Sequence, residues 1–304
     1  MKMIVQSPAK INLFLDITGK RSDGYHIINT VMQSVSLYDD VIVTLENDSN
    51  EIRLSCSKDE IPCDSTNTAY KAAELFFEHT GIKRKGVSIR IKKRIPSQAG
   101  MGGGSTDAAA VLYALNELTD SRLTKEELAE LGEKIGADVP FCVYGGTMSA
   151  SGIGTILSPL PDMPDCFFVI VMPDFRISTK EAYESSDRLG YDTVKSIEPL
   201  TNAVCSGNAS QTASLLYNKF EEVADIEEIG NIKSMMKESG ALGALMTGSG
   251  SAVFGIFDEK EKAEECEDIL KKQYDEVYIA EPVRSGPKQI LPGGLIGSFL
   301  AEKY

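Results

Sequence analysis

A glycine-rich run in the first half of the chain could bind an anion. Four glycines fall within residues 100–104, in the segment IPSQAGMGGGSTDAAA, and Ser105 and Thr106 follow at the start of an alanine-rich helical pattern. Glycine lets the backbone approach a ligand closely, and the first turn of a helix offers unpaired N–H groups and the positive end of its dipole. Phosphate is the anion that fits best, and a flexible turn capped by Ser105 is the alternative. The Gly-Lys-Ser/Thr ending of a P-loop and the Gly-x-Gly-x-x-Gly pattern are both missing, so neither of those mechanisms is supported.

A cation and a carboxylate from distant segments could complete a phosphoryl-transfer site. Residues 10–17 alternate between apolar and polar side chains, as in a β-strand, which places Lys10 and Asn12 on one face. Asp138 stands just before a Val-Pro step, which disfavours helix at the residue before the proline and so marks the start of a new element. Taken singly, Lys10 is typical of a solvated strand lysine and Asp138 of a helix cap. Together with the glycine-rich run they could supply an anion cradle, a cation and a carboxylate that orients the attacking hydroxyl.

Two further segments could contact a ligand. A second glycine cluster, residues 247–250 in LMTGSGSAVFGIF, precedes an apolar strand and, taken alone, is as typical of a simple turn as of a binding loop. Tyr25 and His26 follow an Asp-Gly turn. An aromatic ring beside an imidazole suits a planar, hydrogen-bonding ligand such as a nucleobase, while a partly buried histidine with satisfied hydrogen bonds is the alternative. His79 lies at the end of a predicted helix and is assigned no catalytic task.

The composition argues against several classes of protein. The 304 residues include 31 Lys and Arg against 45 Asp and Glu, a net charge of -14, and no basic face for nucleic acid is visible. The apolar runs fall short of the roughly 20 residues that span a bilayer, and no signal peptide is visible, which predicts a cytoplasmic protein without a membrane partner. Six cysteines without a Cys-x-x-Cys pair and two histidines predict no metal site in the protein itself. Because an acidic protein needs local cations to bind polyanions, Lys92, Lys93 and Arg94 are candidates beside Lys10.

The hydrophobic patterns predict an α+β protein of two domains. Three prolines in SPLPDMPD at 158–165 suggest the boundary, giving domains 1–158 and 159–283 and a Gly- and Pro-rich tail 284–304 that could pack on the surface, mediate an oligomer or remain loose. The predicted strands cover residues 10–17, 31–37, 41–45, 87–91, 167–172, 251–257 and 276–281. The predicted helices cover residues 68–79, 106–118, 125–135, 179–188, 210–217, 228–239 and 258–273, and Thr124 with Glu127 forms a capping box before the third of them.

Three motifs occur in the order found in the GHMP small-molecule kinases, and the chain resembles that family. SPAKINLFL, IPSQAGMGGGSTDAAA and LMTGSGSAVFGIF match its three motifs over residues 6–257, while DGYH and GADVPF point to a member with a cytidine-containing substrate. The resemblance implies a ribosomal protein S5 domain 2-like amino-terminal domain that binds ATP and a ferredoxin-like carboxyl-terminal domain. It also implies ATP with Mg²⁺ as cofactors, and transfer of phosphate to the 2-hydroxyl of a cytidine diphosphate-linked methylerythritol in the non-mevalonate pathway to isoprenoids.

The resemblance also implies roles for individual residues. Asp138 would deprotonate or orient the substrate hydroxyl and Lys10 would stabilise the transition state. Met101 and Thr106 stand where Leu and Ser are usual, which keeps size and polarity. The nucleotide would be bound by Pro96, Ala99, Gly100, Met101, Gly102, Gly103, Gly104, Ser105 and Thr106, and the substrate by Asn12, Tyr25, His26, Tyr183, Gly248 and Ser249. The expected protein is a monomer or homodimer. Another GHMP kinase, acting on homoserine, mevalonate or a sugar, and a nucleotide-binding regulator without turnover remain the alternatives.

Overall fold

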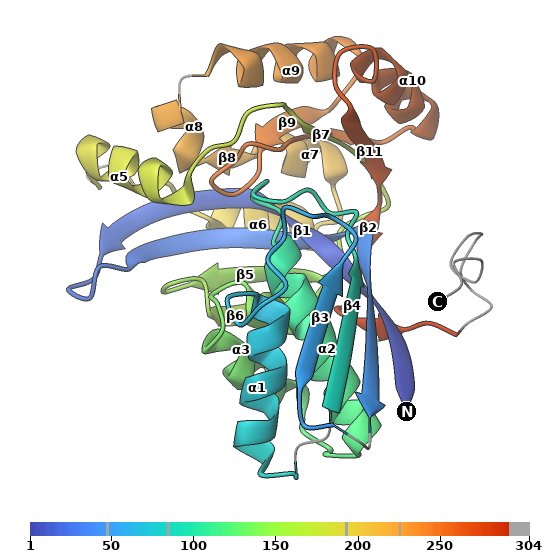
Figure 1. The fold of residues 1–304 in the computed structure, drawn as a ribbon. Helices are drawn as coiled ribbons and strands as arrows, with labels where there is room; N and C mark the ends of the chain where they lie inside the picture. Colours follow the sequence, from blue (N-terminus) through green and yellow to red (C-terminus); the bar gives the residue numbers. More distant parts are fainter. Residues whose placement is uncertain (47–48, 84–85, 192–193, 225, 292–304) are drawn as a thin grey trace.

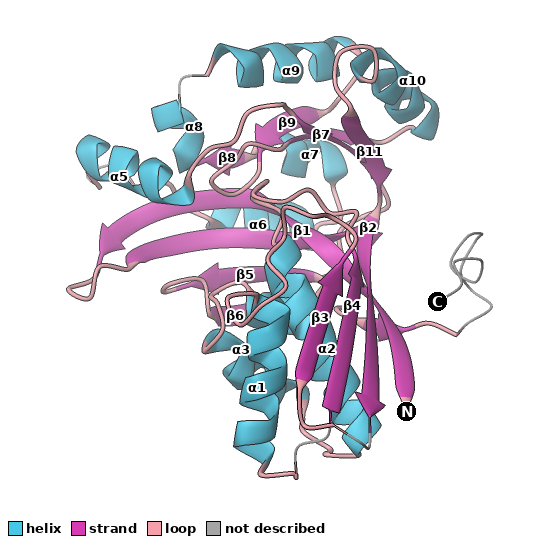
Figure 2. Ribbon diagram, viewed as in Figure 1, coloured by secondary structure: helices cyan, strands magenta, loops and turns pink. Residues whose placement is uncertain are grey.

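The computed structural model describes residues 1–46, 49–83, 86–191, 194–224 and 226–291, and two sheets dominate it (Figure 1). The last part of the expected tail, residues 292–304, lies outside the described residues. Figure 2 shows the strands of the first sheet beside one group of helices and the second sheet beside another. No helix among the described residues is long and apolar enough to cross a membrane.

A long hairpin forms the first sheet's centre. β1 (Lys2–Lys20) and β2 (His26–Glu46) pair antiparallel along almost their whole length, from Lys2 opposite Thr44 to Lys20 opposite His26. The two predicted strands 31–37 and 41–45 are therefore parts of one strand. The remaining strands of this sheet are β3 (Ile52–Cys56), β4 (Gly86–Lys92), β5 (Thr147–Ser151), β6 (Ile156–Pro159) and the short β8 (Tyr217–Asn218), β12 (Pro282–Val283) and β13 (Lys288–Gln289). The proposed boundary near residue 158 falls within β6.

Helices cover one face of the first sheet. The predicted capping box at Thr124 and Glu127 is confirmed, and the Asn67 side chain caps the first helix. In the second helix, α2 (Gly103–Thr119), the alanines at 108–110 are fully buried, so α2 packs closely against its neighbours and the sheet. The helices are α1 (Thr68–Thr80), α2 (Gly103–Thr119), α3 (Lys125–Glu133) and α4 (Val139–Tyr144). Helix α2 begins three residues before the predicted start, so two glycines form its first turn.

The second sheet is antiparallel in the order β11-β7-β10-β9. With helices between its first two and its last two strands, it has the β-α-β-β-α-β arrangement of ferredoxin-like folds, as expected. Its strands are β7 (Phe167–Met172), β9 (Gly243–Met246), β10 (Val253–Phe257) and β11 (Glu276–Ala280). Its helices are α5 (Thr179–Leu189), α6 (Glu198–Cys205), α7 (Ala209–Ser214), α8 (Lys219–Ala224), α9 (Glu227–Glu238) and α10 (Lys260–Leu270).

The hairpin β1–β2 lies between the two halves of the molecule (Figure 1). Ile11 and Leu13 of β1 share a fully buried cluster with Phe168 of β7 and with Leu200 of α6. Polar positions on this hairpin are therefore also buried, because both faces of β1 are covered by protein. This sandwiched hairpin is what brings side chains from both sheets to one place.

The predicted helix 210–217 is partly wrong. Helix α7 ends at Ser214, and β8 (Tyr217–Asn218) then pairs with β1 before α8 begins. The Asn218 amide donates to the carbonyls of Met246 (2.7 Å) and Gly248 (2.8 Å), tertiary contacts that hold this stretch extended. Helix α6 was not predicted.

The expected tail 284–304 contributes a strand to the first sheet. β12 (Pro282–Val283), just before the tail, pairs with β2, and β13 (Lys288–Gln289), within it, pairs with β1. The N–H of Gly286 also donates to the carbonyl of Tyr144 at 2.9 Å, so this segment braces the end of α4. The first part of the tail thus packs on the surface, one of the three possibilities open from the sequence.

Candidate active site

Lys10 is buried, contrary to the expectation for a single strand lysine. Its side chain is 5% exposed, because the glycine-rich run packs against it, where a Cβ on Gly102 would lie only 3.0 Å from Lys10 Cγ. The ammonium donates to Asn12 Oδ1 at 2.7 Å, which confirms that the two side chains share a face. Asn12 in turn donates through Nδ2 to Thr30 Oγ1 at 2.8 Å, and Thr30 donates to the Phe14 carbonyl at 2.6 Å. The direction of the Lys10 ammonium is therefore set by a chain of hydrogen bonds within the hairpin.

Asp138 occupies the N-cap position of α4, yet its side chain makes no capping hydrogen bond within the described part of the chain. Its carboxylate lies instead with Oδ2 3.4 Å from Lys10 Nζ, and the side chain is 39% exposed. The interpretation of Asp138 as a simple helix cap is thus wrong. A half-exposed carboxylate beside a buried ammonium can accept a proton from a ligand hydroxyl. The ammonium then compensates the negative charge that is left on the hydroxyl oxygen.

The glycine-rich run packs directly against Lys10. The Lys10 N–H donates to the Met101 carbonyl at 3.0 Å, and a Cβ on Gly102 would lie 3.0 Å from Lys10 Cγ. Gly102 has a φ of 68° and is the N-cap of α2, which has no side-chain cap among the described residues. The N–H groups of Gly103, Gly104 and Ser105 make up the first turn, where an anion is favoured.

The second glycine cluster closes against the first. A Cβ on Gly100, whose φ is 72°, would lie 2.1 Å from the Thr247 carbonyl oxygen, and one on Gly248 would lie 2.9 Å from the Gly100 carbonyl oxygen. Thr247 Oγ1 also accepts a hydrogen bond from the Asn12 N–H at 2.9 Å. The two loops and the Lys10 strand therefore meet, although the sequence alone left the role of the second loop open.

A cleft of about 980 Å³ opens where these parts meet. Lys10, Asn12 and Asp138 line it together with Gly102 and Ser105 of the first loop. The residues Tyr25, His26, Tyr183, Gly248 and Ser249 also line it. One cavity thus brings together a cation, a carboxylate, an uncapped helix start and an aromatic cluster.

Comparisons with known proteins show the family of the chain. The family models for the GHMP kinases N terminal domain and the GHMP kinases C terminal match residues 67–146 and 203–276. Relatives named 4-diphosphocytidyl-2-C-methyl-D-erythritol kinase, from Clostridium botulinum and Clostridium tetani, are 42% and 43% identical over 92% of this chain and all of theirs. The chain belongs to this kinase family.

Solved structures agree with the assignment. A crystal structure of 4-(cytidine 5'-diphospho)-2C-methyl-D-erythritol kinase has a TM-score of 0.78 and 31% identity and covers 93% of this chain and 99% of its own. A homoserine kinase from Cytophaga hutchinsonii has a TM-score of 0.76 at 21% identity, covering 95% of this chain and 97% of its own, and shows the shared fold alone. The chain is thus a kinase with the expected GHMP fold.

The aromatic end of this kinase's cleft is held by an acid that the sequence did not reveal. The rings of His26 and Tyr183 stack with centroids 4.3 Å apart, and His26 Nε2 lies 2.6 Å from Asp187 Oδ1. Lys20 and the Tyr191 hydroxyl also donate to Asp187. The spacing of Tyr183 and Asp187 by one helical turn was the available signal, but only the fold shows what they face. Tyr25 is 58% exposed at the rim.

Asp187 is ionised in this cluster. Burial acts to raise its pKa, but the hydrogen bonds from Lys20, Tyr191 and His26 outweigh burial and lower the pKa of Asp187 below its usual range. An ionised carboxylate only accepts hydrogen bonds, so His26 donates through Nε2. The orientation of the imidazole is therefore set by the protein.

Several predicted nucleotide contacts are buried. Pro96, Ala99 and Met101 are covered by protein, so they can shape the loop only from behind. Thr106 is a correction: its Oγ1 is fully buried, donates to the Pro8 carbonyl at 2.8 Å and lies 2.5 Å from Ser7 Oγ. Its N–H continues the helix by donating to the Gly102 carbonyl. Neither polar group of Thr106 is free for a phosphate.

The expected local cations next to the loop already have partners. Lys93 is buried between two carboxylates, and the Arg94 guanidinium donates to Asp40. Their charges are largely neutralised within the fold, so Lys10 is the predicted cation that reaches the cleft.

The loop geometry fits a triphosphate. Gly100 and Gly102 let the loop pack closely on Thr247 and Lys10, which brings the start of α2, uncapped within the described residues, to the cleft. Those residues contain no group of three or more His, Cys, Asp or Glu side chains that could hold a metal ion.

Proposed function

We propose that this kinase transfers a phosphoryl group from ATP to the 2-hydroxyl of 4-diphosphocytidyl-2-C-methyl-D-erythritol, in the non-mevalonate pathway to isoprenoids. The observation that carries this is the Lys10–Asp138 pair, with Nζ and Oδ2 3.4 Å apart in the cleft beside the uncapped start of α2. The names of the relatives at 42% and 43% identity supply the substrate. The aromatic cluster at Tyr25, His26 and Tyr183 supports a nucleobase as part of it.

The side chains of the cleft would divide the reaction among them. Asp138 accepts the proton of the substrate hydroxyl as that oxygen forms its bond to phosphorus. Lys10, held by Asn12 at 2.7 Å, stabilises the negative charge on the hydroxyl oxygen and the transferred group. The N–H groups at the start of α2 bind the phosphates of ATP, and they hold those of ADP when the bond between ADP and the transferred group breaks. Bound Mg²⁺ would neutralise phosphate charge during this transfer.

The cytidine end of the substrate would lie at the aromatic cluster. His26 has its Nε2 occupied by Asp187, so its ring is fixed in one orientation beside Tyr183. Tyr25 at the exposed rim could close over a bound base. We place Gly248 and Ser249 along the substrate because the second glycine loop lines the same cleft. We further propose that the enzyme is cytoplasmic. We also propose that it works as a monomer or homodimer, since one chain supplies every one of these residues.

The test is ADP production by the purified protein with Mg-ATP and one acceptor at a time: the cytidine-linked methylerythritol, mevalonate, homoserine or galactose. We expect turnover with the cytidine compound alone. Turnover with another acceptor would retain the phosphoryl-transfer chemistry and overturn the substrate. Silence with every acceptor, combined with measurable ATP binding, would favour a nucleotide-binding regulator.

A further inference from the structure

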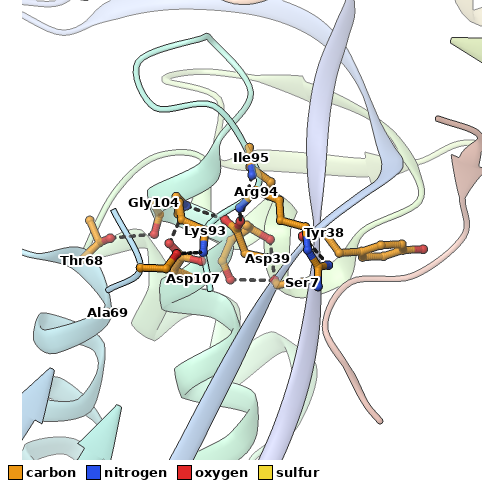
Figure 3. Close-up of polar contacts among 12 residues, drawn as sticks. Ser7, Tyr38, Asp39, Thr68, Ala69, Lys93, Arg94, Ile95, Gly104 and Asp107 are labelled. Carbon is orange, nitrogen blue, oxygen red and sulfur yellow. Dashed lines mark hydrogen bonds and ion pairs between the residues drawn. The ribbon is translucent and has the colours of Figure 1, made fainter. Parts of the chain in front are cut away.

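A buried lysine lies behind the glycine-rich loop (Figure 3). Lys93 Nζ is 2.5 Å from Asp39 Oδ2 and 2.6 Å from Asp107 Oδ2, and the three side chains are 3%, 0% and 4% exposed. Asp39 lies on β2, Lys93 follows β4, and Asp107 lies on α2. One ammonium therefore joins two neighbouring strands to the helix that carries the proposed phosphate site.

The same cluster fixes the chain as it leaves β4. Asp39 Oδ1 accepts hydrogen bonds from the backbone N–H groups of Arg94 at 2.6 Å and Ile95 at 2.9 Å. These are the first residues of the segment that leads to Gly100. The carboxylate thus replaces the sheet hydrogen bonds that end with β4 and sets the direction of the loop at its origin.

The Lys93 ammonium also contacts the first residue of α2. A Cβ on Gly103 would lie 2.9 Å from Lys93 Nζ, so a glycine is needed for the helix start to approach the ammonium this closely. Lys93 itself is not among the residues that line the cleft. Its influence on a ligand would therefore pass through the backbone of the first turn.

The cluster is not arranged for stability alone. Two carboxylates face one ammonium, and the second oxygen of Asp107 is buried without a hydrogen-bond partner in the described part of the chain. Burying charges costs free energy that mutual attraction often fails to offset, and an unpaired polar atom adds to this cost. A residue set with such a cost is most useful where it fixes a geometry.

We propose that Lys93 is a positioning residue for the phosphates of ATP. Through Asp39 and Asp107 it holds the start of the loop and the first turn of α2 at the separation at which the N–H groups of that turn meet a phosphate. This inference rests on the proposed function only in assigning ATP to this loop. The contact made by the phosphates, and not that made by the nucleoside, should depend on Lys93.

Binding measured by calorimetry without the second substrate tests this. We compare wild type, Lys93→Met and Asp107→Asn, each titrated with ATP, ADP and adenosine. We expect both variants to lose about tenfold or more in affinity for ADP and ATP, since small misplacements of binding groups have effects of this size, and to bind adenosine as wild type does. Arg94→Met is the matched control, because its guanidinium is 38% exposed and pairs with Asp40. It should bind all three ligands normally.

Each outcome is decisive. If wild type fails to bind ATP, the proposed function is wrong, and the inference about Lys93 is wrong with it, because the loop then binds no phosphates of ATP. If wild type binds ATP and the variants bind ADP equally well, with only their melting temperatures lowered, the cluster is structural and the inference is wrong. Equal losses for adenosine and ADP would also overturn it. Should Lys93→Met fail to fold, Asp107→Asn carries the comparison, because it keeps the Lys93–Asp39 pair and the side-chain volume.

Discussion

Lys10 and Asp138 differ in their surroundings, and this separates their roles. Lys10 is buried and held by Asn12, while Asp138 is 39% exposed and turned away from the helix that it precedes. A fixed cation beside an accessible carboxylate is the arrangement that a hydroxyl nucleophile needs. Asn12 matters as much for direction as Lys10 does for charge, since the ammonium could otherwise turn toward other acceptors.

Removing the charge of Asp138 should slow the chemical step. We expect Asp138→Asn to lower kcat by about 10²- to 10⁴-fold, the usual contribution of a general base, with affinity for ATP little changed. Steady-state rates and ATP titration measure the two quantities. Asp162→Asn is the control, because Asp162 is exposed and pairs with Arg284 at the surface. A kcat for Asp138→Asn equal to that of wild type would remove Asp138 from the mechanism.

The Asp187 cluster should make stability depend on pH in a defined direction. Burial alone would raise the pKa of Asp187, but the hydrogen bonds that Asp187 accepts lower its pKa in the folded state below 3.8. The folded state then binds fewer protons than the unfolded state, so this contribution to stability is complete above pH about 4 and is lost as the pH falls further. Asp187→Asn should melt lower than wild type at pH 7.

The measurement is the melting temperature of wild type and Asp187→Asn between pH 7 and pH 3. We expect the difference between them to shrink as the pH falls below about 4, where the wild type begins to lose the contribution. A difference that stays constant over this range would show that the ionised carboxylate is not the stabilising species.

At the scale of elements, the two glycine loops and the start of α2 act as one unit. Gly100 and Gly248 allow the two loop backbones to touch, and Gly103 allows α2 to approach the Lys93 ammonium. Each glycine is needed for a close approach between segments. The glycine-rich run is therefore closely packed on one side, while Gly100, Gly102 and Ser105 line the cleft.

A side chain at Gly100 should separate the loops. Its Cβ would lie 2.1 Å from the Thr247 carbonyl oxygen, in addition to the strain of a φ of 72°. Gly207 has a similar φ of 69° with nothing in the described part of the chain within 4 Å of its Cβ. Gly207→Ala should thus cost only about 1–2 kcal/mol of the free energy of unfolding, the cost of the left-handed backbone.

We expect Gly100→Ala to cost clearly more than Gly207→Ala and to weaken ATP binding, which Gly207→Ala should leave intact. Urea unfolding gives the free energies and calorimetry gives the affinities. Equal losses of stability for the two variants, with equal ATP affinity, would show that the contact between the loops is not needed.

At the scale of the whole molecule, the hairpin β1–β2 makes the two halves interdependent. Its residues Ile11 and Leu13 belong to the same buried cluster as Phe168 and Phe254 of the second sheet. The segment at 282–289 returns from the second half to pair with both hairpin strands. The two halves therefore share a core instead of meeting at a thin interface.

A single cooperative unfolding transition should follow from the shared core. We expect Leu200→Ala, 1% exposed between the two sheets, to lower the free energy of unfolding by about 2–5 kcal/mol without splitting the transition. Circular dichroism and tyrosine fluorescence should report the same midpoint, and the chain has no Trp to complicate the signal. Leu189→Ala, at a side chain 54% exposed, is the control and should change little. Two separate transitions would show independent domains.

The sequence by itself determined the elements whose signals are local. The capping box at Thr124, the strand 167–172 and the helix 179–188 were predicted close to their observed bounds, because caps and hydrophobic periods depend on near neighbours. The order of three motifs also identified the family. Lys10, Asp138 and the glycine-rich run could be named as candidates because their residue types suit phosphoryl transfer.

Only the tertiary structure decided the states of those residues. Taken singly, Lys10 looked solvated and Asp138 looked like a cap, but the fold packs the glycine-rich run against Lys10 and places the two side chains 3.4 Å apart. Thr106 looked available to a phosphate, but its hydroxyl is used by Pro8. Asp39 and Asp107 carried no local signal, and the one-turn spacing of Tyr183 and Asp187 did not show what they face, because burial and ion pairing arise between segments distant in sequence. The physical reason is that periodicity reports the environment of one element, while a site depends on how several elements pack together.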